Sequence, residues 1–250
     1  MLLRQTGLST AILALTISSP VQAGWQDLIN QTMDQASKSG ALDVSKSALS
    51  NSEVVAGLKE ALANGVESAI NTLGKPGGFA GNKLVEITVP DSLKTVTSTV
   101  RALGQGEYVD SFELTMNQAA EKAVPEAASI LSDAIRQMSI DDAIKILHGP
   151  NDSATQYFRK VSEASLEQKF KPIVSQATDQ TGVTAAYKNL TSEAAPLLSG
   201  VIDESSINLD QYITSKTLDG LFEYISLEEK SIRDNPAARS TELLKKVFAQ

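Results

Sequence analysis

The stretch SIDDAIKILHGPNDSATQYF, residues 139–158, contains the end of one helix and the start of the next. Ser139 and Asp142 form a capping-box pattern, in which each side chain binds the other residue's backbone amide. Gly149 stands where helices often end in the left-handed conformation, and Pro150 prevents the helix from continuing. The pattern therefore predicts a helix that ends at His148 and a sharp joint between two helices.

His148 is the only histidine of the chain. A donor side chain suits the last turn of a helix, where the carbonyl groups have no partner within the helix. Ser153 and Gln156 fit a second capping box, so the next helix is expected to begin at once. The favoured interpretation is thus a helix joint. The alternative is an anion site, because the free amides after Ser153 would form a helix N-terminus near His148.

Outward from this joint, apolar residues recur at intervals of three and four along most of the chain, which predicts amphipathic helices. One apolar stripe runs from Val55 to Leu73, and Gly65 within it would let another helix approach closely. The other expected features are a kink or a new helix start at Pro125, a helix through Phe170 with a shorter one past Pro172, a helix from Leu209 to Ile225, a capping box at Ser226 and Glu229, and a last helix begun by Asn235 and Pro236.

The stretch GKPGGFAGNKLVEITVPDSL, residues 74–93, departs from this periodicity. Its glycines predict a loop, and residues 84–89 are rich in β-formers. Because no second strand signal occurs, these residues are expected to form an extended segment packed on helices. The glycine run resembles a phosphate-binding loop only superficially, since it follows a helix and lacks the Lys-Ser/Thr ending. The sequence thus predicts an all-α fold, a single multi-helix domain with one short extended segment near residues 84–89.

The first 23 residues have the layout of a cleavable export signal. Arg4 precedes an apolar run from Leu8 to Ile17, which is too short to span a bilayer, and small residues end at Ala23. Cleavage is expected after Ala23. Residues 24–50 are then expected to form a short amphipathic helix at Trp25 and a polar linker, and residues 51–250 an all-helical domain. No later stretch predicts an integral membrane segment, so the cleaved chain is expected to be soluble.

Composition excludes several kinds of site. With one histidine and no cysteine, the chain cannot form disulfides, a Cys–His nucleophile pair or a zinc ribbon, and no metal or cofactor is expected. Without the signal, which contains one arginine and no acid, the net charge is 21 − 30 = −9. An acidic chain without a basic run argues against binding to nucleic acid.

Four polar residues form the candidate binding site: Asn117, Glu121, Arg233 and Arg239. Asn117 and Glu121 are four residues apart and should share one face of a helix beside small alanines. A partly desolvated Glu121 needs a partner, and either arginine could supply a bidentate guanidinium. The favoured interpretation is a structural clamp between Glu121 and one arginine. The alternative is a polar pocket for a ligand.

Four stretches carry a resemblance to a known family: GLKEALANGVESAI at residue 57, MNQAAEKAVPEA at 116, DAIKILHGPNDSATQYF at 142, and YITSKTLDGLFEYISLEEKSIRDNPAARSTELLKKVF at 212. The chain resembles the bacterial proteins grouped as domain of unknown function 4197. In that family a basic residue often follows the Asn of the "MN" pair, whereas here Gln118 does. The resemblance implies an all-helical fold and a Gram-negative envelope location, and it supplies no reaction.

These observations favour a periplasmic binding or interaction protein over an enzyme, because side chains suited to catalysis are scarce. Its partner would be an unknown small molecule or an envelope protein. The alternative is a carboxylate-dependent hydrolase acting on an envelope glycan or peptide, which would need two facing carboxylates in a cleft. A third interpretation is an assembly factor, suggested by the amphipathic segment at Trp25.

Overall fold

The computed structural model describes residues 50–198 and 208–235. Within these ranges the chain is helical and contains no strand, which confirms the all-α prediction. The predicted export signal, the helix near Trp25, the polar linker and the helix after Pro236 lie outside the described residues. The α-helices are α2 (Asn51–Leu73), α3 (Lys94–Ala102), α4 (Gly106–Ala123), α5 (Ala127–Gln137), α6 (Ile140–His148), α7 (Ser153–Thr181), α8 (Val183–Leu198) and α9 (Leu209–Asp234).

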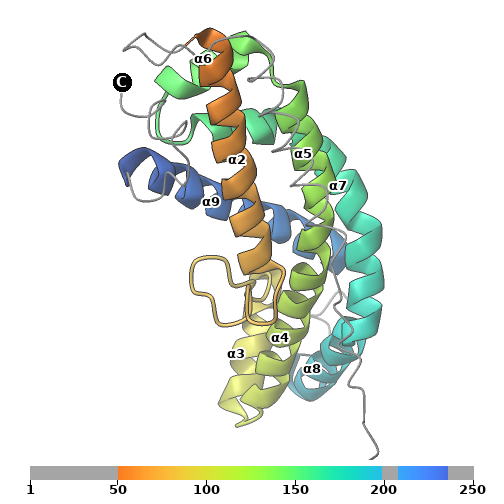
Figure 1. The fold of residues 1–250 in the computed structure, drawn as a ribbon. Helices are drawn as coiled ribbons and strands as arrows, with labels where there is room; N and C mark the ends of the chain where they lie inside the picture. The colour runs from red at the N-terminus through yellow and green to blue at the C-terminus, as the bar shows by residue number, and fades with distance from the viewer. Residues whose placement is uncertain (1–49, 199–207, 236–250) are drawn as a thin grey trace, which may run out of the picture.

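Helix α9 crosses the middle of the molecule, while α7 runs along one side (Figure 1). Helices α3, α4 and α8 gather at one end, and α6 lies at the other, next to the start of α2. Because α9 packs against α2, α4 and α7, it joins elements from the whole described chain.

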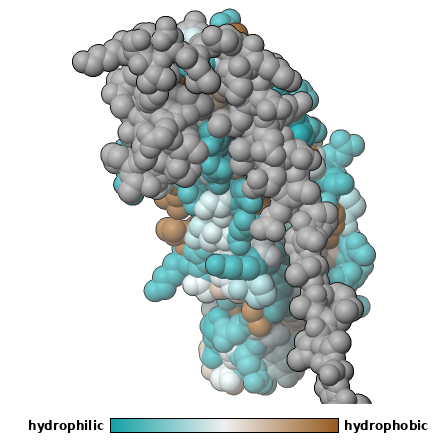
Figure 2. All heavy atoms as spheres, viewed as in Figure 1, coloured by the Kyte–Doolittle hydropathy of each residue, from teal (hydrophilic) through white to brown (hydrophobic). Residues whose placement is uncertain are grey.

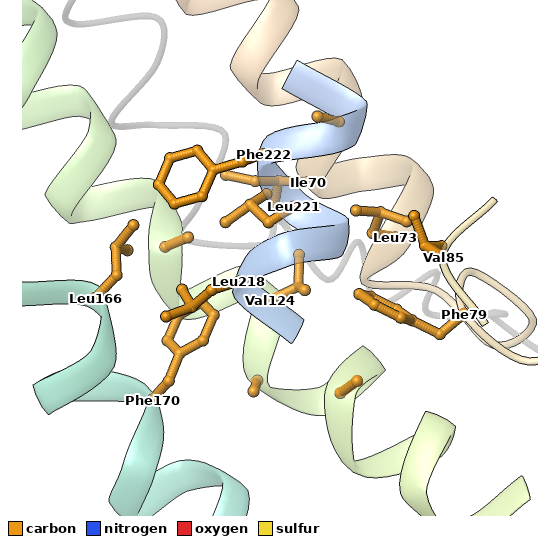
Figure 3. Close-up of a cluster of buried hydrophobic side chains, with 14 of the residues drawn as sticks. Ile70, Leu73, Phe79, Val85, Val124, Leu166, Phe170, Leu218, Leu221 and Phe222 are labelled. Carbon is orange, nitrogen blue, oxygen red and sulfur yellow. The ribbon is translucent and has the colours of Figure 1, made fainter. Parts of the chain in front are cut away.

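The buried apolar side chains form one main cluster, to which every described α-helix contributes. On the face drawn in Figure 2, by contrast, the hydrophobic residues outside the grey regions are scattered among hydrophilic ones. Part of this core lies where α9 meets its neighbours. Figure 3 shows side chains meeting there from α9 (Leu218, Leu221, Phe222), α2 (Ile70, Leu73) and α7 (Leu166, Phe170).

Helix α2 begins with a capping box between Ser50 and Glu53, whose carboxylate accepts the Ser50 amide at 2.8 Å. Its apolar stripe is buried as predicted. Gly65 faces α9, where an added Cβ would lie 3.4 Å from the Cβ of Glu228. The two helices therefore lie close together here, at a distance that would also admit an alanine.

The segment after α2, here called the glycine loop (residues 74–90), contains no strand. Residues 83–85 form a turn in which the amides of Val85 and Glu86 both donate to the carbonyl of Asn82. Residues 86–90 have no regular secondary structure and lead into the 3-10 turn η1 (Asp91–Leu93). Val85 and Ile87 are buried on the helices, which is the packing expected for this segment.

Two predicted helix boundaries are wrong. Pro172 lies inside α7, which continues to Thr181. The neighbouring Phe170 and Val174 are both fully buried, so packing on one continuous helix offsets the roughly 3 kcal/mol that an internal proline costs. Ser226 likewise starts no new helix, because α9 is continuous to Asp234. The predicted break at Pro125 is present as the 3-10 turn η2 (Val124–Glu126) between α4 and α5.

Candidate functional site

Helix α4 presents Glu121 to the glycine loop. The Oε1 atom of Glu121 accepts hydrogen bonds from the amides of Gly77, Phe79 and Ala80 at 3.0, 3.1 and 3.0 Å. Gly77 has φ = +81°, a conformation open to glycine without a steric penalty. Convergent backbone amides of this kind bind anions in many proteins. Here the anion is a side chain of the same chain.

Asn117, one turn earlier on α4, pairs with the backbone of Ile87. Its Oδ1 atom accepts the Ile87 amide at 2.8 Å, and its Nδ2 atom donates to the Ile87 carbonyl at 2.8 Å. This is the pairing that a neighbouring strand would offer to both backbone groups of one residue. With Asn117 only 1% exposed, the pairing satisfies backbone groups that would otherwise be buried without partners.

The other side of the glycine loop packs on α9 at Gly220. A Cβ atom added there would lie 2.7 Å from Cε1 of Phe79 and 3.1 Å from Cβ of Val85. The Nδ2 atom of Asn82 also donates to the hydroxyl of Tyr224 at 2.6 Å. The loop is therefore held between α4 and α9, with the fully buried ring of Phe79 inside.

A second buried carboxylate, Glu229 of α9, lies at the joint between α6 and α7. Its two oxygens accept the amides of Ala154 and Thr155, each at 2.9 Å, and Oε2 also accepts the Thr155 hydroxyl at 2.9 Å. The first amides of a helix have no partner within the helix and carry partial positive charge. Glu229 thus caps α7 from another helix.

Arg233, one turn further along α9, caps the opposing end of α6. It donates to the carbonyls of Ile146 and Leu147 at 2.7 and 3.2 Å, and it forms an ion pair with Glu229 at 2.9 Å. The Arg233 side chain is 11% exposed and that of Glu229 is 4% exposed. One ion pair therefore satisfies the electropositive start of α7 and the electronegative end of α6.

The residues of the joint lie where the sequence placed them, but their conformation differs. α6 ends at His148, which is exposed, and α7 begins at Ser153. Gly149 is extended (φ −85°, ψ −179°) and not left-handed. A Cβ at Gly149 would lie 2.1 Å from the Ser153 hydroxyl oxygen, so close packing favours glycine there. Ser153 donates to the carbonyl of Pro150 and does not form the predicted capping box.

Two small hollows border the Glu229–Arg233 pair between α2, α7 and α9. Each encloses about 10 Å³, room for roughly one water molecule. Ligand pockets for small molecules are tens of times larger. Their walls are mainly apolar side chains such as Leu62, Phe158 and Ile232.

The structure brings together only part of the predicted site. Asn117 and Glu121 share a face of α4, and both face the glycine loop. Arg233 lies at the α6–α7 joint and pairs with Glu229, so it is not the arginine that would meet Glu121. Arg239 lies outside the described residues, and its pairing with Glu121 stays a prediction.

The sequence reasoning missed the role of Glu229. Its distance from Ser226 suggested a capping box, whereas its carboxylate reaches α7. One signal was available, since Glu229 follows Ile225 by four residues and precedes Ile232 by three, which places it on the apolar face of α9. A charged residue in an apolar stripe predicts a buried partner.

Two further properties concern the described part of the chain alone. No group of three or more acidic or histidine side chains comes together there in a way that could hold a metal ion. No helix in these ranges combines the length and the apolar character needed to cross a membrane.

The fold and the site define an all-helical protein in which two buried carboxylates cap elements of its own backbone. The chain belongs to the family described as "Protein of unknown function (DUF4197)", which it matches over residues 48–249, most of its length. This confirms the resemblance seen in the sequence. Neither the curated proteins nor the solved structures give a significant match.

Proposed function

We propose that the chain is an exported periplasmic protein that acts as a non-catalytic binding or interaction module. The supporting observation is the state of Glu121 and Glu229, the two buried acids at the sites described. Protein donors surround both carboxylates: three amides for Glu121, and two amides, a hydroxyl and a guanidinium for Glu229. A general base must reach the proton that it removes, within hydrogen-bond distance or through one water.

The space around Glu229 supports the same proposal. A hydrolase with two carboxylates needs a separation of about 5–10 Å across a cleft that admits the substrate. Glu229 borders hollows of about 10 Å³, and Glu121 is covered by the glycine loop. A partner would therefore bind away from these two carboxylates, and an unknown small molecule or an envelope protein remains the proposed class.

The export part of the proposal rests on residues 1–23. We expect periplasmic extracts to contain a protein whose first residue is Gly24, as determined by N-terminal sequencing. Protein found only in the cytosol with Met1 intact would contradict this part and leave the binding proposal untouched.

The binding part can be tested on protein purified from the periplasm without denaturation. Native mass spectrometry should show a bound small molecule or protein that is lost after unfolding and refolding. The same preparation should leave peptidoglycan fragments and peptides intact. Cleavage that is abolished by Glu121→Gln or Glu229→Gln, but kept by the exposed control Glu223→Gln, would favour the hydrolase instead.

A further inference from the structure

The inference starts from Glu60, a buried acid that no part of the site above uses. Glu60 is two residues from both Leu58 and Leu62, so it lies on the side of α2 away from the apolar stripe. A charged residue on that side is normally exposed, yet Glu60 is 5% exposed. Gly57, on the same side one turn earlier, is buried as well.

The described neighbours of α2 approach it from other sides. Helix α9 contacts it at Gly65 and Ser68, whose hydroxyl donates to Glu228 at 2.6 Å. The end of α5 meets it at Lys59, which donates to the carbonyl of Arg136 at 3.0 Å. Helix α6 also packs on α2, and its Ile146 lines a small hollow with Leu58 and Leu62 of the apolar stripe. The burial of Glu60 therefore indicates a further element on this face of α2.

This face carries a regular row of acids. Glu53, Glu60 and Glu67 follow each other at intervals of seven residues, which is close to two turns of a helix and keeps them on one side. The row covers 15 residues, or about 20 Å along the helix axis. A complementary element would be a helix of similar length with basic residues at the same spacing.

The sequence of residues 236–250 fits such an element. They are also 15 residues long, and Arg239 and Lys246 are seven residues apart. Apolar residues beside these two cations could pack on α2: Leu243, Leu244, Val247 and Phe248. Pro236 suits the first turn of such a helix. The segment carries three basic residues against one acid, which complements the acidic row.

Two observations favour this segment over other parts of the chain. Ile232, near the end of α9, packs on Ala61 of α2, so the chain leaves α9 beside the turn that carries Glu60. The family match includes residues 236–249 but begins only at residue 48, so the N-terminal part before it is not a family feature.

We infer that residues 236–250 form a helix that docks on the acidic face of α2, with Arg239 and Lys246 against the carboxylates of Glu53, Glu60 and Glu67. The docked segment covers the face of α2 that α5, α6 and α9 do not contact. This inference is independent of the proposed function. It also gives Arg239 a partner on α2, in place of Glu121.

Disulfide trapping tests the docking directly, because the chain has no native cysteine. Cysteine pairs would join Asn64 to Leu243 or Val247 in the full chain, with Thr241, which is on the opposite side of the expected helix, as the control. We expect at least one of the first two pairs to form an intramolecular disulfide under mild oxidation, and the Thr241 pair to form none. Disulfides only between two copies, or equal trapping at all three positions, would overturn the inference.

Charge reversal gives an independent measurement. Lys246→Glu should lower the melting temperature by about 2–4 °C, and adding Glu60→Lys should restore at least half of the loss. The adjacent Lys245→Glu, on the other edge of the segment, should have a smaller effect. Equal effects of the two lysine substitutions, without restoration by Glu60→Lys, would contradict the inferred contact. If a cysteine at position 64 instead forms a disulfide with a cysteine at position 29, this face of α2 is covered by the N-terminal segment.

Discussion

Replacing Glu229 by glutamine would test the ion pair at the α6–α7 joint with little change in side-chain volume. The carboxylate accepts the amides of Ala154 and Thr155 with two different oxygens, and it also pairs with Arg233. A carboxamide retains one oxygen, and its NH2 group would face donors where the second oxygen was. The guanidinium of Arg233, 11% exposed, would remain buried without its anion.

The expected cost follows from these contacts. Removing one member of a buried ion pair typically destabilises a protein by about 3–5 kcal/mol. Arg233 would keep its two carbonyl acceptors, at Ile146 and Leu147, and glutamine would keep one acceptor. We therefore expect the low end, about 3 kcal/mol, which for a domain of this size lowers the melting temperature by roughly 6–12 °C.

Urea unfolding followed by far-UV circular dichroism measures this cost. Glu223→Gln, an exposed substitution on the same helix, is the matched control and should stay within about 0.5 kcal/mol of the wild type. Arg233→Gln should cost at least 1 kcal/mol less in the Glu229→Gln background than alone, because no uncompensated charge remains. If Glu229→Gln and Glu223→Gln unfold at the same urea concentration, the capping argument is refuted.

Three further predictions concern other contacts of the fold. Gly220→Ala should lower the free energy of unfolding by about 1–3 kcal/mol, because the new methyl group would lie 2.7 Å from the ring of Phe79. Gly65→Ala, whose methyl group would have 3.4 Å of space, should cost less than 0.5 kcal/mol or stabilise the fold through helix propensity. Equal losses of the two variants in urea unfolding would contradict this. Asn117→Leu should lower the free energy of unfolding by about 3 kcal/mol, since two buried backbone groups of Ile87 lose their hydrogen-bond partner. Hydrogen exchange of the Ile87 amide should also accelerate, and an unchanged exchange rate would count against the pairing. A hydrogen bond from Ser139 lowers the pKa of Asp142. This contact therefore stabilises the fold at neutral pH, and the stabilisation is lost as the pH falls through that pKa. Ser139→Ala should raise the pKa of Asp142 in an NMR titration, and an unchanged pKa would argue against the capping box.

Helix ends that depend on local side chains could be predicted from the sequence. The Ser139–Asp142 capping box and the end of α6 at His148 use residues within one turn of each other, so short-range patterns determine them. Pro172 and Ser226 gave misleading signals, because packing against distant helices outweighs a local preference of a few kcal/mol. The continuity of α7 and α9 depends on the shared core, which local patterns do not contain.

The candidate site, like the fold, could be predicted only where it depends on residues close together in the sequence. Helical spacing correctly placed Asn117 and Glu121 on one face of α4. Their partners are backbone groups 30 to 44 residues away along the chain, which no side-chain pattern reveals. Backbone amides carry no sequence signature, so the search for a partner of Glu121 turned to arginines. The capping role of Glu229 could not be predicted for the same reason, because its partners include the backbone amides of Ala154 and Thr155.

The distance along the chain between Glu229 and the amides that it caps has a consequence for biosynthesis. Glu229 is translated 74–75 residues after Thr155 and Ala154. At about 5–20 residues per second, a ribosome needs roughly 4–15 s to add that stretch. During this interval the nascent α7 begins with uncapped amides, and its apolar face has no α9 to pack against. The joint between α6 and α7 can therefore reach its final, capped form only after α9 has been made.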